Sequence, residues 1–382
     1  MPRLIYVVNI PRFFVSHRLP LALAAQQAGY EVHIATSEET AGVYDSESLA
    51  AIRASGLPFH PLPLAQHGTN PFSEVRLLAA LVRLYRQLQP DLVHQVSIKP
   101  VLYGGLAAHL TGVQGIVSAM SGLGYVFLGE GAKARLLQRL IHPVLRLALM
   151  GRNTRMIFQN STDQDRFVRL GYIQAQQARL IRGSGVEMAR FSPQPEAEGL
   201  PVVLFAGRLM WQKGVGEFVQ AARHINAQGR RARFVVVGYS EATSPSTVSP
   251  SQLQAWAEEG IIEWWGKRTD MPQVFAESHI VCLPSSYGEG VPKVLIEAAA
   301  CGRAIVTTDS AGCNDICQHE VNGLLVPVGE QSALEAALLR LIEDRATRQR
   351  YGAEGRLRAE REFALPVIIA QTLAVYEELL TS

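Results

Sequence analysis

Short apolar runs alternate with longer stretches of helical periodicity along most of the chain. In the first half, the runs predict strands at residues 4–10, 31–36, 91–96, 115–120, 155–160 and 179–182. Between them, apolar residues at helical spacing predict helices at residues 19–28, 46–55, 74–88, 101–110, 132–150 and 162–170. Strands that alternate with helices in this way indicate a parallel sheet covered by helices on both faces.

The alternation restarts after a break at residues 191–201, which are rich in Pro, Glu and Gln and predict a linker between two domains. Residues 240–251, rich in Ser, Thr and Pro, predict a surface loop. Further strands are expected at residues 202–207, 234–238, 261–266, 279–284, 304–308 and 323–326. We therefore predict an α/β protein of two Rossmann-like domains, residues 1–190 and 200–362. Residues 363–382 are expected to form a final helix able to cross back to the first domain.

Charge is distributed unevenly between the two halves. Residues 1–190 contain 19 Lys and Arg against 11 Asp and Glu, whereas residues 191–382 contain 17 against 23. A basic half suits a partner with phosphate groups or an anionic membrane. The overall charge of only +2 argues against a dedicated nucleic-acid-binding protein.

The four cysteines all lie in the second half and form no metal-binding pattern. We interpret them as reduced, structural thiols of a cytosolic protein. The apolar run at residues 4–10 is too short for a signal peptide. No uncharged run of 18 residues occurs, so no membrane-spanning segment is expected.

The segment with the most specific chemistry is residues 287–301, YGEGVPKVLIEAAAC, which follows a predicted strand. Ligands of open α/β sheets bind at the carboxyl ends of strands. Gly288 and Gly290 permit a tight turn, and Pro292 fits the first turn of a helix. We expect a helix start with unpaired N–H groups, which is an anion site.

Two glutamates flank this predicted anion site. Glu289 and Glu297 are eight residues apart, about 12 Å along a helix. A carboxylate can accept hydrogen bonds from two vicinal hydroxyls. Glu297 could therefore hold a ribose and Glu289 a sugar, with a diphosphate between them. Taken alone, two glutamates at this spacing are more often a helix-start acid and a solvated side chain.

A second candidate phosphate-binding loop follows the strand at residues 202–207. Gly207 permits close approach of a ligand, and Arg208 and Lys213 can reach a diphosphate from the strand end. The alternative is two solvated basic residues in a loop. That alternative weakens because this loop and the 287–301 segment are expected at the same edge of one sheet.

Together these motifs resemble the donor domain of retaining glycosyltransferases of family 4, which have the GT-B architecture of two Rossmann-like domains facing each other across a cleft. The resemblance covers residues 202–315 and most of the second half. It rests on Gly207, Arg208, Lys213 and Gly214, on Gly238 and Gly266, on Glu289 to Glu297 with Gly290, Val291, Pro292 and Lys293 between them, on Ala298 and Gly302, and on Gly312, Asn322 and Gly323.

The resemblance implies a role for each matching residue. Arg208 and Lys213 would contact the diphosphate, Glu297 the ribose and Glu289 the donor sugar. The backbone around Arg268 would face the base. No Asp-x-Asp pair follows a strand to hold a divalent cation, so we expect a metal-independent enzyme without a cofactor.

The first half resembles the family less strictly, because residues 9–19 contain no glycine. Together with residues 91–105 and 118–125, they resemble the subgroup that extends polyprenyl-diphosphate-linked saccharides in surface polysaccharide or lipopolysaccharide assembly. On the acceptor side we consider His17 and Arg18, expected in a loop at the cleft mouth. His94 is as consistent with a packed core histidine as with a substrate contact. Lys99 could bind an acceptor diphosphate or simply begin a helix next to Pro100.

A basic stretch at residues 133–155 predicts a membrane contact. Six cations lie between Glu130 and Asp163 without an acid, and apolar residues recur among them at helical spacing: Lys133, Arg135, Arg139, Arg146, Arg152 and Arg155. Such a helix can lie on an anionic membrane surface. The alternative is a helix that faces the core and has a solvated basic face.

The sequence thus predicts transfer of a hexose or N-acetylhexosamine from a UDP-sugar to a lipid-linked saccharide, with retention of configuration. We expect a cytoplasmic protein, peripheral at the inner face of the membrane. Two alternatives stay open: a sugar-nucleotide epimerase or another enzyme of two Rossmann-like domains, and a non-catalytic nucleotide-sugar-binding protein.

Overall fold

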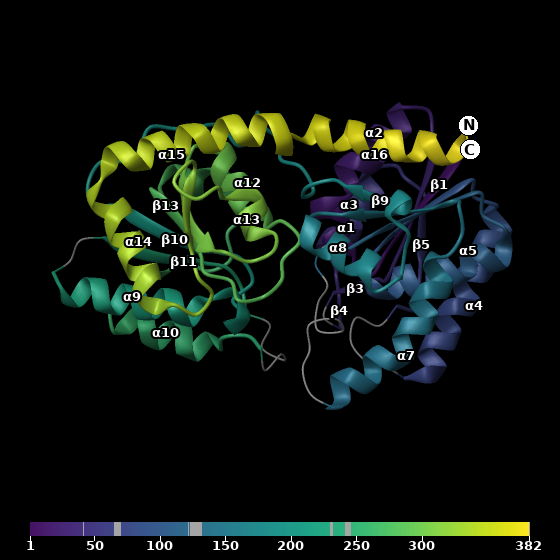
Figure 1. Cartoon of the computed structure of the whole chain (residues 1–382), viewed down its shortest axis with the longest axis horizontal. Coiled ribbons are helices and arrows are strands. Elements are labelled where there is room, and N and C mark those ends of the chain that lie inside the picture. The colour runs from purple at the N-terminus through teal and green to yellow at the C-terminus, as the bar shows by residue number, and fades with distance from the viewer. Residues whose placement is uncertain are drawn as a thin grey trace. The chain divides into compact units, whose positions relative to one another are not determined.

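The computed structural model describes residues 1–40, 42–64, 70–120, 122, 132–229, 232–240 and 246–381, with only the backbone of residues 132–137 and 140. The chain forms two compact units. Unit 1 consists of Met1–Ser184 together with Ile368–Ser382, and unit 2 of Gly185–Val367 (Figure 1). The predicted two-domain α/β fold is confirmed.

Unit 1 contains, within the described residues, a seven-stranded parallel sheet in the order β5-β2-β1-β6-β7-β8-β9. Its strands are β1 (Arg3–Val8), β2 (Glu31–Thr36), β5 (Phe59–Pro61), β6 (Leu92–Val96), β7 (Gly115–Ala119), β8 (Thr154–Phe158) and β9 (Ala178–Leu180). The short strands β3 (Glu39–Thr40) and β4 (Val43–Tyr44) pair with each other in an antiparallel ladder.

The helices of unit 1 cover both faces of this sheet. They are α1 (Pro11–His17), α2 (Leu19–Gln27), α3 (Ser46–Ala54), α4 (Pro71–Leu88), a π-helical turn at Pro100–Gly104, α5 (Gly105–Thr111), α7 (Ala132–Leu149), α8 (Ser161–Arg169) and α16 (Leu365–Leu380). Alternate residues of β1 enter different cores: Leu4 and Tyr6 pack with α2 and α16, whereas Ile5 and Val7 pack with α4 and α5. Burial on both faces explains the nearly continuous apolar run of this strand.

Unit 2 contains, within the described residues, a six-stranded parallel sheet in the order β12-β11-β10-β13-β14-β15. Its strands are β10 (Val202–Ala206), β11 (Arg233–Val237), β12 (Glu263–Trp264), β13 (Ile280–Leu283), β14 (Ala304–Thr308) and β15 (Gly323–Val326). Its helices are α9 (Val215–Ala227), α10 (Pro250–Glu258), α11 (Met271–Ala276), α12 (Lys293–Ala300), α13 (Cys313–Ile316), α14 (Gln331–Glu343) and α15 (Arg345–Arg358). Figure 1 shows α9 and α10 on one side of the strands and α15 on the other.

The predicted linker at residues 191–201 is part of unit 2, so this interpretation is corrected. Phe191 enters the core of unit 2. Glu196 accepts two hydrogen bonds, of 3.0 and 3.1 Å, from the buried guanidinium of Arg348. A composition rich in Pro and Glu gave no sign of this ion pair. The division between the units instead follows Ser184.

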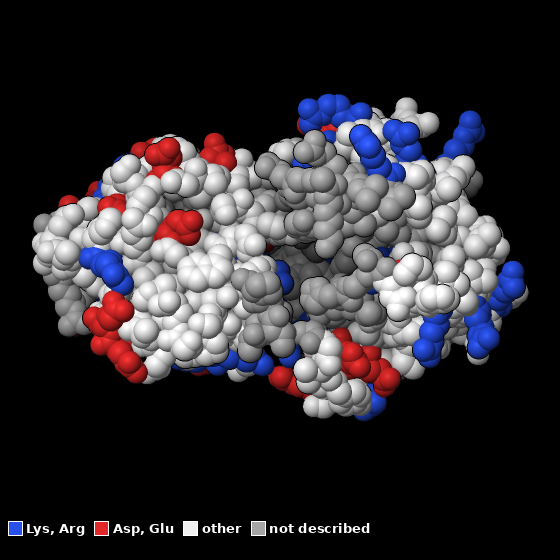
Figure 2. All heavy atoms as spheres, turned by 90° about the horizontal axis from the view of Figure 1, so that it is seen from below, with Lys and Arg blue, Asp and Glu red and all other residues white. Residues whose placement is uncertain are grey.

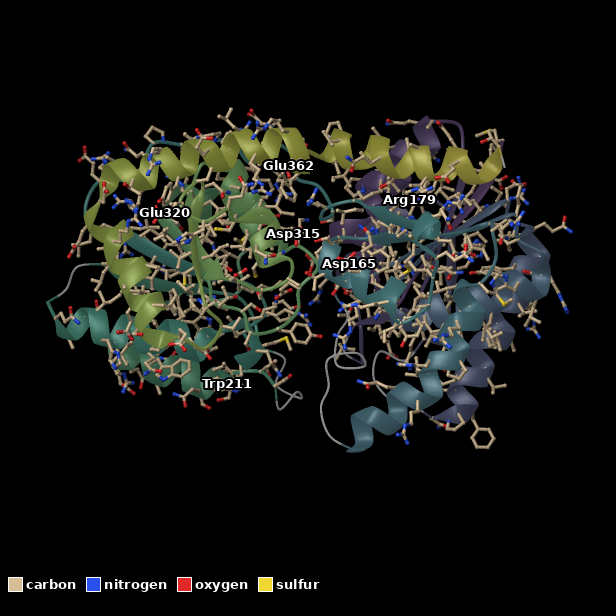
Figure 3. The ribbon with its side chains drawn as sticks, viewed as in Figure 1. Asp165, Arg179, Trp211, Asp315, Glu320 and Glu362 are labelled. Atoms are coloured by element: carbon tan, nitrogen blue, oxygen red, sulfur yellow. The ribbon has the colours of Figure 1, made fainter. Side chains whose placement is uncertain are left out.

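One further predicted boundary also shifts. The loop expected at residues 240–251 ends earlier, because Pro250 starts α10 and Ser249 caps it through Gln252 N at 3.1 Å. Of the basic stretch at 133–155, the part predicted as a helix at 132–150 forms α7, which ends at Leu149, whereas Arg155 lies on β8 in the predicted strand. Arg155 and Arg179 both bind Glu378 of α16, which fixes that helix on unit 1. Arg179 is labelled below α16 in Figure 3.

The two halves differ in surface charge as the sequence indicates. In Figure 2, Lys and Arg predominate at the unit 1 end of the visible face, and Asp and Glu predominate over unit 2. No helix of the described residues has the length and apolarity needed to cross a bilayer.

Candidate active site

The order of the strands in unit 2 creates a binding crevice. The chain begins this sheet at β10, adds β11 and β12 on one side, and then adds β13 to β15 on the other. The carboxyl ends of β10 and β13 therefore flank the point where the winding reverses, which is where open α/β sheets bind ligands. The two predicted phosphate loops follow these two strands.

A pocket of about 250 Å³ lies at this crevice. It brings together residues from the ends of β10 and β11, from the segment between β12 and α11, and from α12: Ala206, Gly207, Arg208, Val237, Gly238, Tyr239, Lys267, Arg268, Met271, Val294 and Glu297. Gly238 lies so close to β10 that a Cβ on it would be 2.0 Å from the Gly207 carbonyl oxygen. Four of the predicted donor-side residues, Gly207, Arg208, Arg268 and Glu297, therefore line one pocket.

Glu297 lies within α12, and its carboxylate is poorly solvated. Its side chain is 12% exposed, and its nearest charge is the Lys293 ammonium at 3.8 Å, one helical turn earlier. Burial raises the pKa of Glu297 to about 7, although Lys293 and Arg190 oppose this rise. Burial likewise lowers the pKa of Lys293. Glu297 is thus an incompletely paired acceptor at the wall of the pocket.

We expect binding of a ribose at this pocket to depend on pH. The folded protein holds the Glu297 proton more tightly than the unfolded chain, so this group's contribution to stability falls as pH rises from 4.5 to about 7. Ribose hydroxyls donate to the ionised carboxylate, so ribose affinity rises over the same range. Uridine, which has no phosphate of its own to titrate, should bind about 10-fold more tightly at pH 8 than at pH 6.

The matched variant for this measurement is Glu297→Gln, which keeps the shape of the side chain and cannot ionise. Its uridine affinity should be weak and flat between pH 6 and 8, as measured by calorimetry. A wild-type affinity that did not change with pH would contradict the assignment of ribose contact to Glu297.

Lys213 and Glu289 form the most direct contact between the two loops. The Lys213 Nζ lies 2.6 Å from the Glu289 Oε1, and both side chains are 14% exposed. Ser285 donates to the same Glu289 oxygen at 3.4 Å. Lys213 ends a short turn at Trp211–Lys213, and Gly214 follows it with a φ of +84°. Lys213, predicted at the diphosphate, and Glu289, predicted at the donor sugar, are therefore hydrogen-bonded partners.

Arg208 and Arg268 have different environments at the pocket. Arg208 is exposed and has no ion-pair partner within the described part of the chain. The Arg268 guanidinium is held by both oxygens of Asp270, at 2.7 and 2.6 Å, and lies over the Trp265 ring. The Arg208 guanidinium is thus exposed at the pocket, whereas the Arg268 guanidinium is paired with Asp270.

The start of α12 differs from the prediction in one respect. Pro292 precedes the helix as its cap, with a φ of −61° and a ψ of 118°, and Lys293 is the first helical residue. Gly290, Val291 and Lys293 each take part in further interactions within the protein. Pro292 was expected in the first turn and instead precedes it, and the anion site at this helix start stays a prediction.

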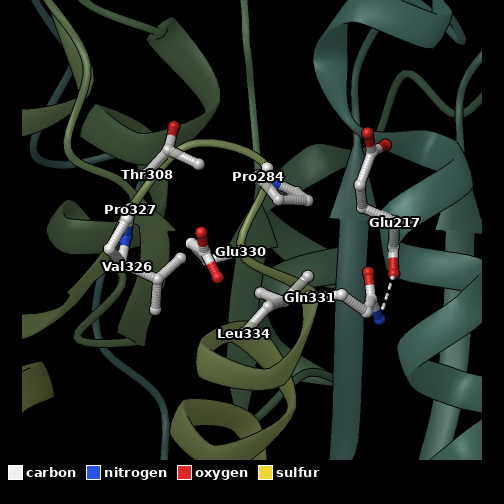
Figure 4. A pocket seen from close by; sticks show the side chains of 9 residues that line it. Glu217, Pro284, Thr308, Val326, Pro327, Glu330, Gln331 and Leu334 are labelled. Atoms are coloured by element: carbon white, nitrogen blue, oxygen red, sulfur yellow. Dashed lines mark hydrogen bonds between the residues drawn. The ribbon is translucent and has the colours of Figure 1, made fainter.

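A second hollow lies beside the site, at the ends of β13, β14 and β15 (Figure 4). Glu217 and Glu330 line it, and the Gln331 amide donates to the Glu217 carbonyl oxygen at 3.3 Å. Its space of about 10 Å³ is about that of one water molecule. This hollow is too small for a nucleotide, so the pocket of about 250 Å³ at the ends of β10 and β11 is the candidate donor site.

On unit 1, the expected loop at residues 9–19 is helical, which corrects the predicted setting of His17 and Arg18. His17 ends α1 and stacks on Phe13, with the ring centroids 4.2 Å apart. Arg18 is 6% exposed, and burial lowers its pKa. Pro11 stands at the first position of α1 and Pro20 at the second of α2, where proline starts helices rather than ending them. A buried Arg18 does not support the predicted acceptor contact.

His94 is a core histidine in this structure, the first of the two readings left open. It is 1% exposed and lies within β6. Its Nδ1 shares a hydrogen bond with the Tyr376 hydroxyl, and its ring stacks on Tyr6. Burial, and then the nearby Arg18 charge, hold the pKa of His94 well below its ordinary value. The side chain is neutral and turned toward α16.

Lys99 follows β6 at the carboxyl edge of the unit 1 sheet, where the winding of that sheet also reverses. It precedes the π-helical turn that begins at Pro100. Its ammonium lies 2.6 Å from Glu74 of α4. Lys99 thus stands at a helix start and forms an ion pair, and its contact with an acceptor stays a prediction. Much of the turn at residues 118–125 falls outside the described residues.

Tyr376 was missed by sequence reasoning. It lies in the final helix, far along the chain from the histidine it binds, and a tyrosine in an amphipathic helix carries no local signal of a long-range partner. The same holds for Tyr239 and Met271, which line the donor pocket without belonging to a motif.

Two family models match the chain, one in each unit. Residues 3–161 match a model described as glycosyl transferase 4-like, and residues 200–344 match one described as glycosyl transferases group 1. The chain is a glycosyltransferase with the GT-B fold. It belongs to the group 1, family 4-like glycosyltransferases, and the epimerase and non-catalytic alternatives are set aside.

Individual relatives are distant but cover most of the chain. An N,N'-diacetylbacillosaminyl-diphospho-undecaprenol alpha-1,3-N-acetylgalactosaminyltransferase of Campylobacter jejuni is 26% identical over 87% of each chain. A UDP-Gal:alpha-D-GlcNAc-diphosphoundecaprenol alpha-1,3-galactosyltransferase of Escherichia coli is 25% identical over 74% of each. Among solved structures, Anabaena HepE in complex with UDP and glucose has a TM-score of 0.80 and 17% identity, covering 99% of this chain and 100% of that one.

Proposed function

We propose that this glycosyltransferase moves a hexose or N-acetylhexosamine from a UDP-sugar to a saccharide linked to a polyprenyl diphosphate. The observation that carries the proposal is the pairing of Lys213 with Glu289 beside the pocket that Glu297 lines. The printed activities of the Campylobacter and Escherichia relatives, both on diphospho-undecaprenol-linked sugars, support the acceptor class. The UDP and glucose complex of the Anabaena neighbour supports the donor class.

In the proposed reaction, the bond between the anomeric carbon and the β-phosphate oxygen breaks, and the acceptor hydroxyl oxygen forms the new bond. The UDP that leaves carries the electron pair, and the acceptor proton is released. Arg208 and Lys213 stabilise the negative charge that develops on the diphosphate, which is the kind of electrostatic assistance that lowers a barrier most. Glu297 holds the ribose, Glu289 orients the donor sugar, and the backbone near Arg268 faces the base. No divalent cation or cofactor takes part in this proposal, and configuration is retained.

The experiment that tests the function measures UDP release from a panel of UDP-hexoses and UDP-N-acetylhexosamines. Donors are first ranked by thermal stabilisation of the protein, and the best is then mixed with undecaprenyl-diphosphate-linked saccharides. UDP release that requires the saccharide, together with a product heavier by one sugar, is expected. Conversion of the donor to its epimer, or release indifferent to the saccharide, would overturn the proposal.

The second part of the proposal is a peripheral position on the cytoplasmic face of an anionic membrane, through unit 1. The predicted basic helix contributes Arg139, which is exposed, and Leu147, which is 52% exposed; Arg146 instead donates to the Leu170 carbonyl oxygen. The side chains of Lys133 and Arg135 lie outside the described part of the structure.

The neighbouring helix α4 supports the same surface. Phe72 is 85% exposed and Val75 67% exposed. Arg76, Arg83 and Arg86 follow along its outer side, and none has an ion-pair partner within the described residues. Helices α4, α5 and α7 pack beside one another, so the apolar and basic side chains share one layer. Unpaired arginines next to exposed apolar groups suit the headgroup region of an anionic bilayer.

We expect Arg83→Ser combined with Arg86→Ser to weaken binding to phosphatidylglycerol vesicles by about 30-fold, at roughly 1 kcal/mol per charge. Co-sedimentation at low salt measures the effect. Arg223→Ser on unit 2, which removes an exposed arginine paired with Glu259, is the matched control and should bind as the wild type does. Equal binding by the α4 double variant would refute the assigned surface.

A further inference from the structure

Trp211 is a large aromatic side chain left at the surface of unit 2. It begins the turn that ends at Lys213, and it is 43% exposed. Figure 3 labels it at the lower edge of unit 2. It does not line the donor pocket. A tryptophan gains more from burial than most side chains do, so a half-exposed one beside a catalytic lysine calls for an explanation.

The ring is held in place on two sides. Trp256 of α10 meets it edge-on, with the ring centroids 6.0 Å apart and the planes at 89°. Gly216, in the first turn of α9, leaves room for the ring: a Cβ there would lie 3.3 and 3.5 Å from two carbons of the Trp211 ring. A ring supported in this way loses little conformational freedom when a ligand packs on it.

The turn that carries Trp211 is also fixed relative to Glu289. The Gln212 carbonyl oxygen accepts a hydrogen bond of 2.9 Å from Ser286 N and one of 3.3 Å from Ser285 Oγ. The next residue, Lys213, binds Glu289 itself. Because these contacts lie within one unit, the distance between the ring and the position of the donor sugar is set by the fold of unit 2 alone.

Two described residues of this turn and of the loop it contacts offer neutral polar groups. Gln212 and Ser286 are exposed and offer an amide and a hydroxyl, and the charge of Lys213 is balanced by Glu289. An indole face bordered by neutral hydrogen-bonding groups suits a pyranose, whose C–H face packs on the ring while its hydroxyls bond to amides. An anionic headgroup or a phosphate would instead need an unpaired cation on this turn.

We propose that Trp211 is a sugar-stacking platform that binds a pyranose of the acceptor saccharide, other than the one that receives the transferred sugar. The inference rests on the proposed function, since it takes the saccharide to be the acceptor. It adds a contribution from unit 2 to acceptor recognition, which sequence reasoning assigned to unit 1.

The test compares undecaprenyl-diphosphate-linked acceptors of one, two and three sugars. Trp211→Ala should raise the KM for the longest acceptor about 10-fold, as loss of a stacking ring does elsewhere, with little change for the shortest. Trp211→Phe should restore most of the loss. The Kd for UDP should stay within about twofold of wild type, since donor contacts are elsewhere.

Two further variants separate binding from structure. Gly216→Ala crowds the ring while improving helix propensity, so it should raise the KM for the longest acceptor without lowering the melting temperature. Val328→Ala truncates another exposed apolar residue of unit 2, 45% exposed, and should leave the KM unchanged. A Trp211→Ala enzyme with the wild-type KM for all three acceptors overturns the platform and leaves the transfer reaction standing.

If no acceptor supports transfer, the proposed function fails, and the platform is judged by binding alone. The indole N–H signal of Trp211, identified by its loss in Trp211→Phe, is followed by NMR during titration with maltotetraose and tetra-N-acetylchitotetraose. A shift of this signal with either saccharide, and none of the Trp264 signal, supports the platform. An unmoved Trp211 signal at saturating concentrations of both overturns it.

Discussion

Lys213→Ala is expected to lower kcat/KM by about 10²- to 10³-fold, the loss seen when one preorganised electrostatic donor is removed from an active site. The Lys213 ammonium lies 2.6 Å from Glu289 before any donor is bound. In the proposed reaction, this ammonium and Arg208 stabilise the charge of the departing diphosphate. The loss should therefore fall mainly on kcat, as measured with saturating donor and acceptor.

Glu289→Gln tests the other half of the pair. It removes the charge that positions Lys213 and keeps a side chain of the same shape, so we expect a loss of about 10²-fold. Because the two groups contact each other, the double variant should lose less than the product of the single losses.

The control for both variants is Arg223→Ala, which breaks an exposed ion pair of the same unit and should retain wild-type turnover. Each variant is checked by thermal unfolding, since a half-buried charge left without its partner costs about 1–3 kcal/mol. Wild-type kcat in Lys213→Ala, with the fold intact, would remove Lys213 from the catalytic group.

The placement of the predicted donor-side residues at one sheet edge could be inferred from the sequence because its signals are local. Glycines, a proline and two glutamates at fixed spacing after a strand specify a turn and a helix start, and the parallel order of the strands places them at one edge. Strand β14 at Ala304–Thr308 and β15 at Gly323–Val326 have the predicted bounds, since fully buried strands are continuous apolar runs between polar turns.

The acceptor side was less predictable because its contacts are long-range. Arg18 and His94, predicted on the acceptor side, are instead buried beside Tyr376; the three come from distant segments that only the fold of unit 1 joins. His17 and Arg18 were expected in a loop, yet His17 ends α1 and Arg18 caps α2. The segment at residues 191–201 was predicted to be a linker because it is rich in Pro, Glu and Gln. Composition does not reveal that Arg348 binds Glu196.

Gly312→Ala is the substitution expected to damage the donor site most without touching a charged group. Gly312 has a φ of +84°, and a Cβ on it would lie 1.8 Å from the Gly290 carbonyl oxygen and 2.7 Å from that of Glu289. The loop that carries Glu289 must shift to accept a methyl group there. A left-handed alanine costs about 1–2 kcal/mol and the overpacking about 1–3 kcal/mol more. Activity should fall at least as far as in Lys213→Ala.

Gly329→Ala separates the collision from the backbone strain. Gly329 has a nearly equal φ of +80°, but nothing lies within 4 Å of where its Cβ would be. It should therefore lose only the left-handed penalty of about 1–2 kcal/mol and keep its turnover. The free energy of unfolding and the kcat/KM of the two variants, measured side by side, show whether the collision adds to the backbone strain. If both lost the same stability and the same activity, the damage in Gly312→Ala would be strain alone, and the close packing of Gly312 against the Glu289 loop would have no part in placing that carboxylate.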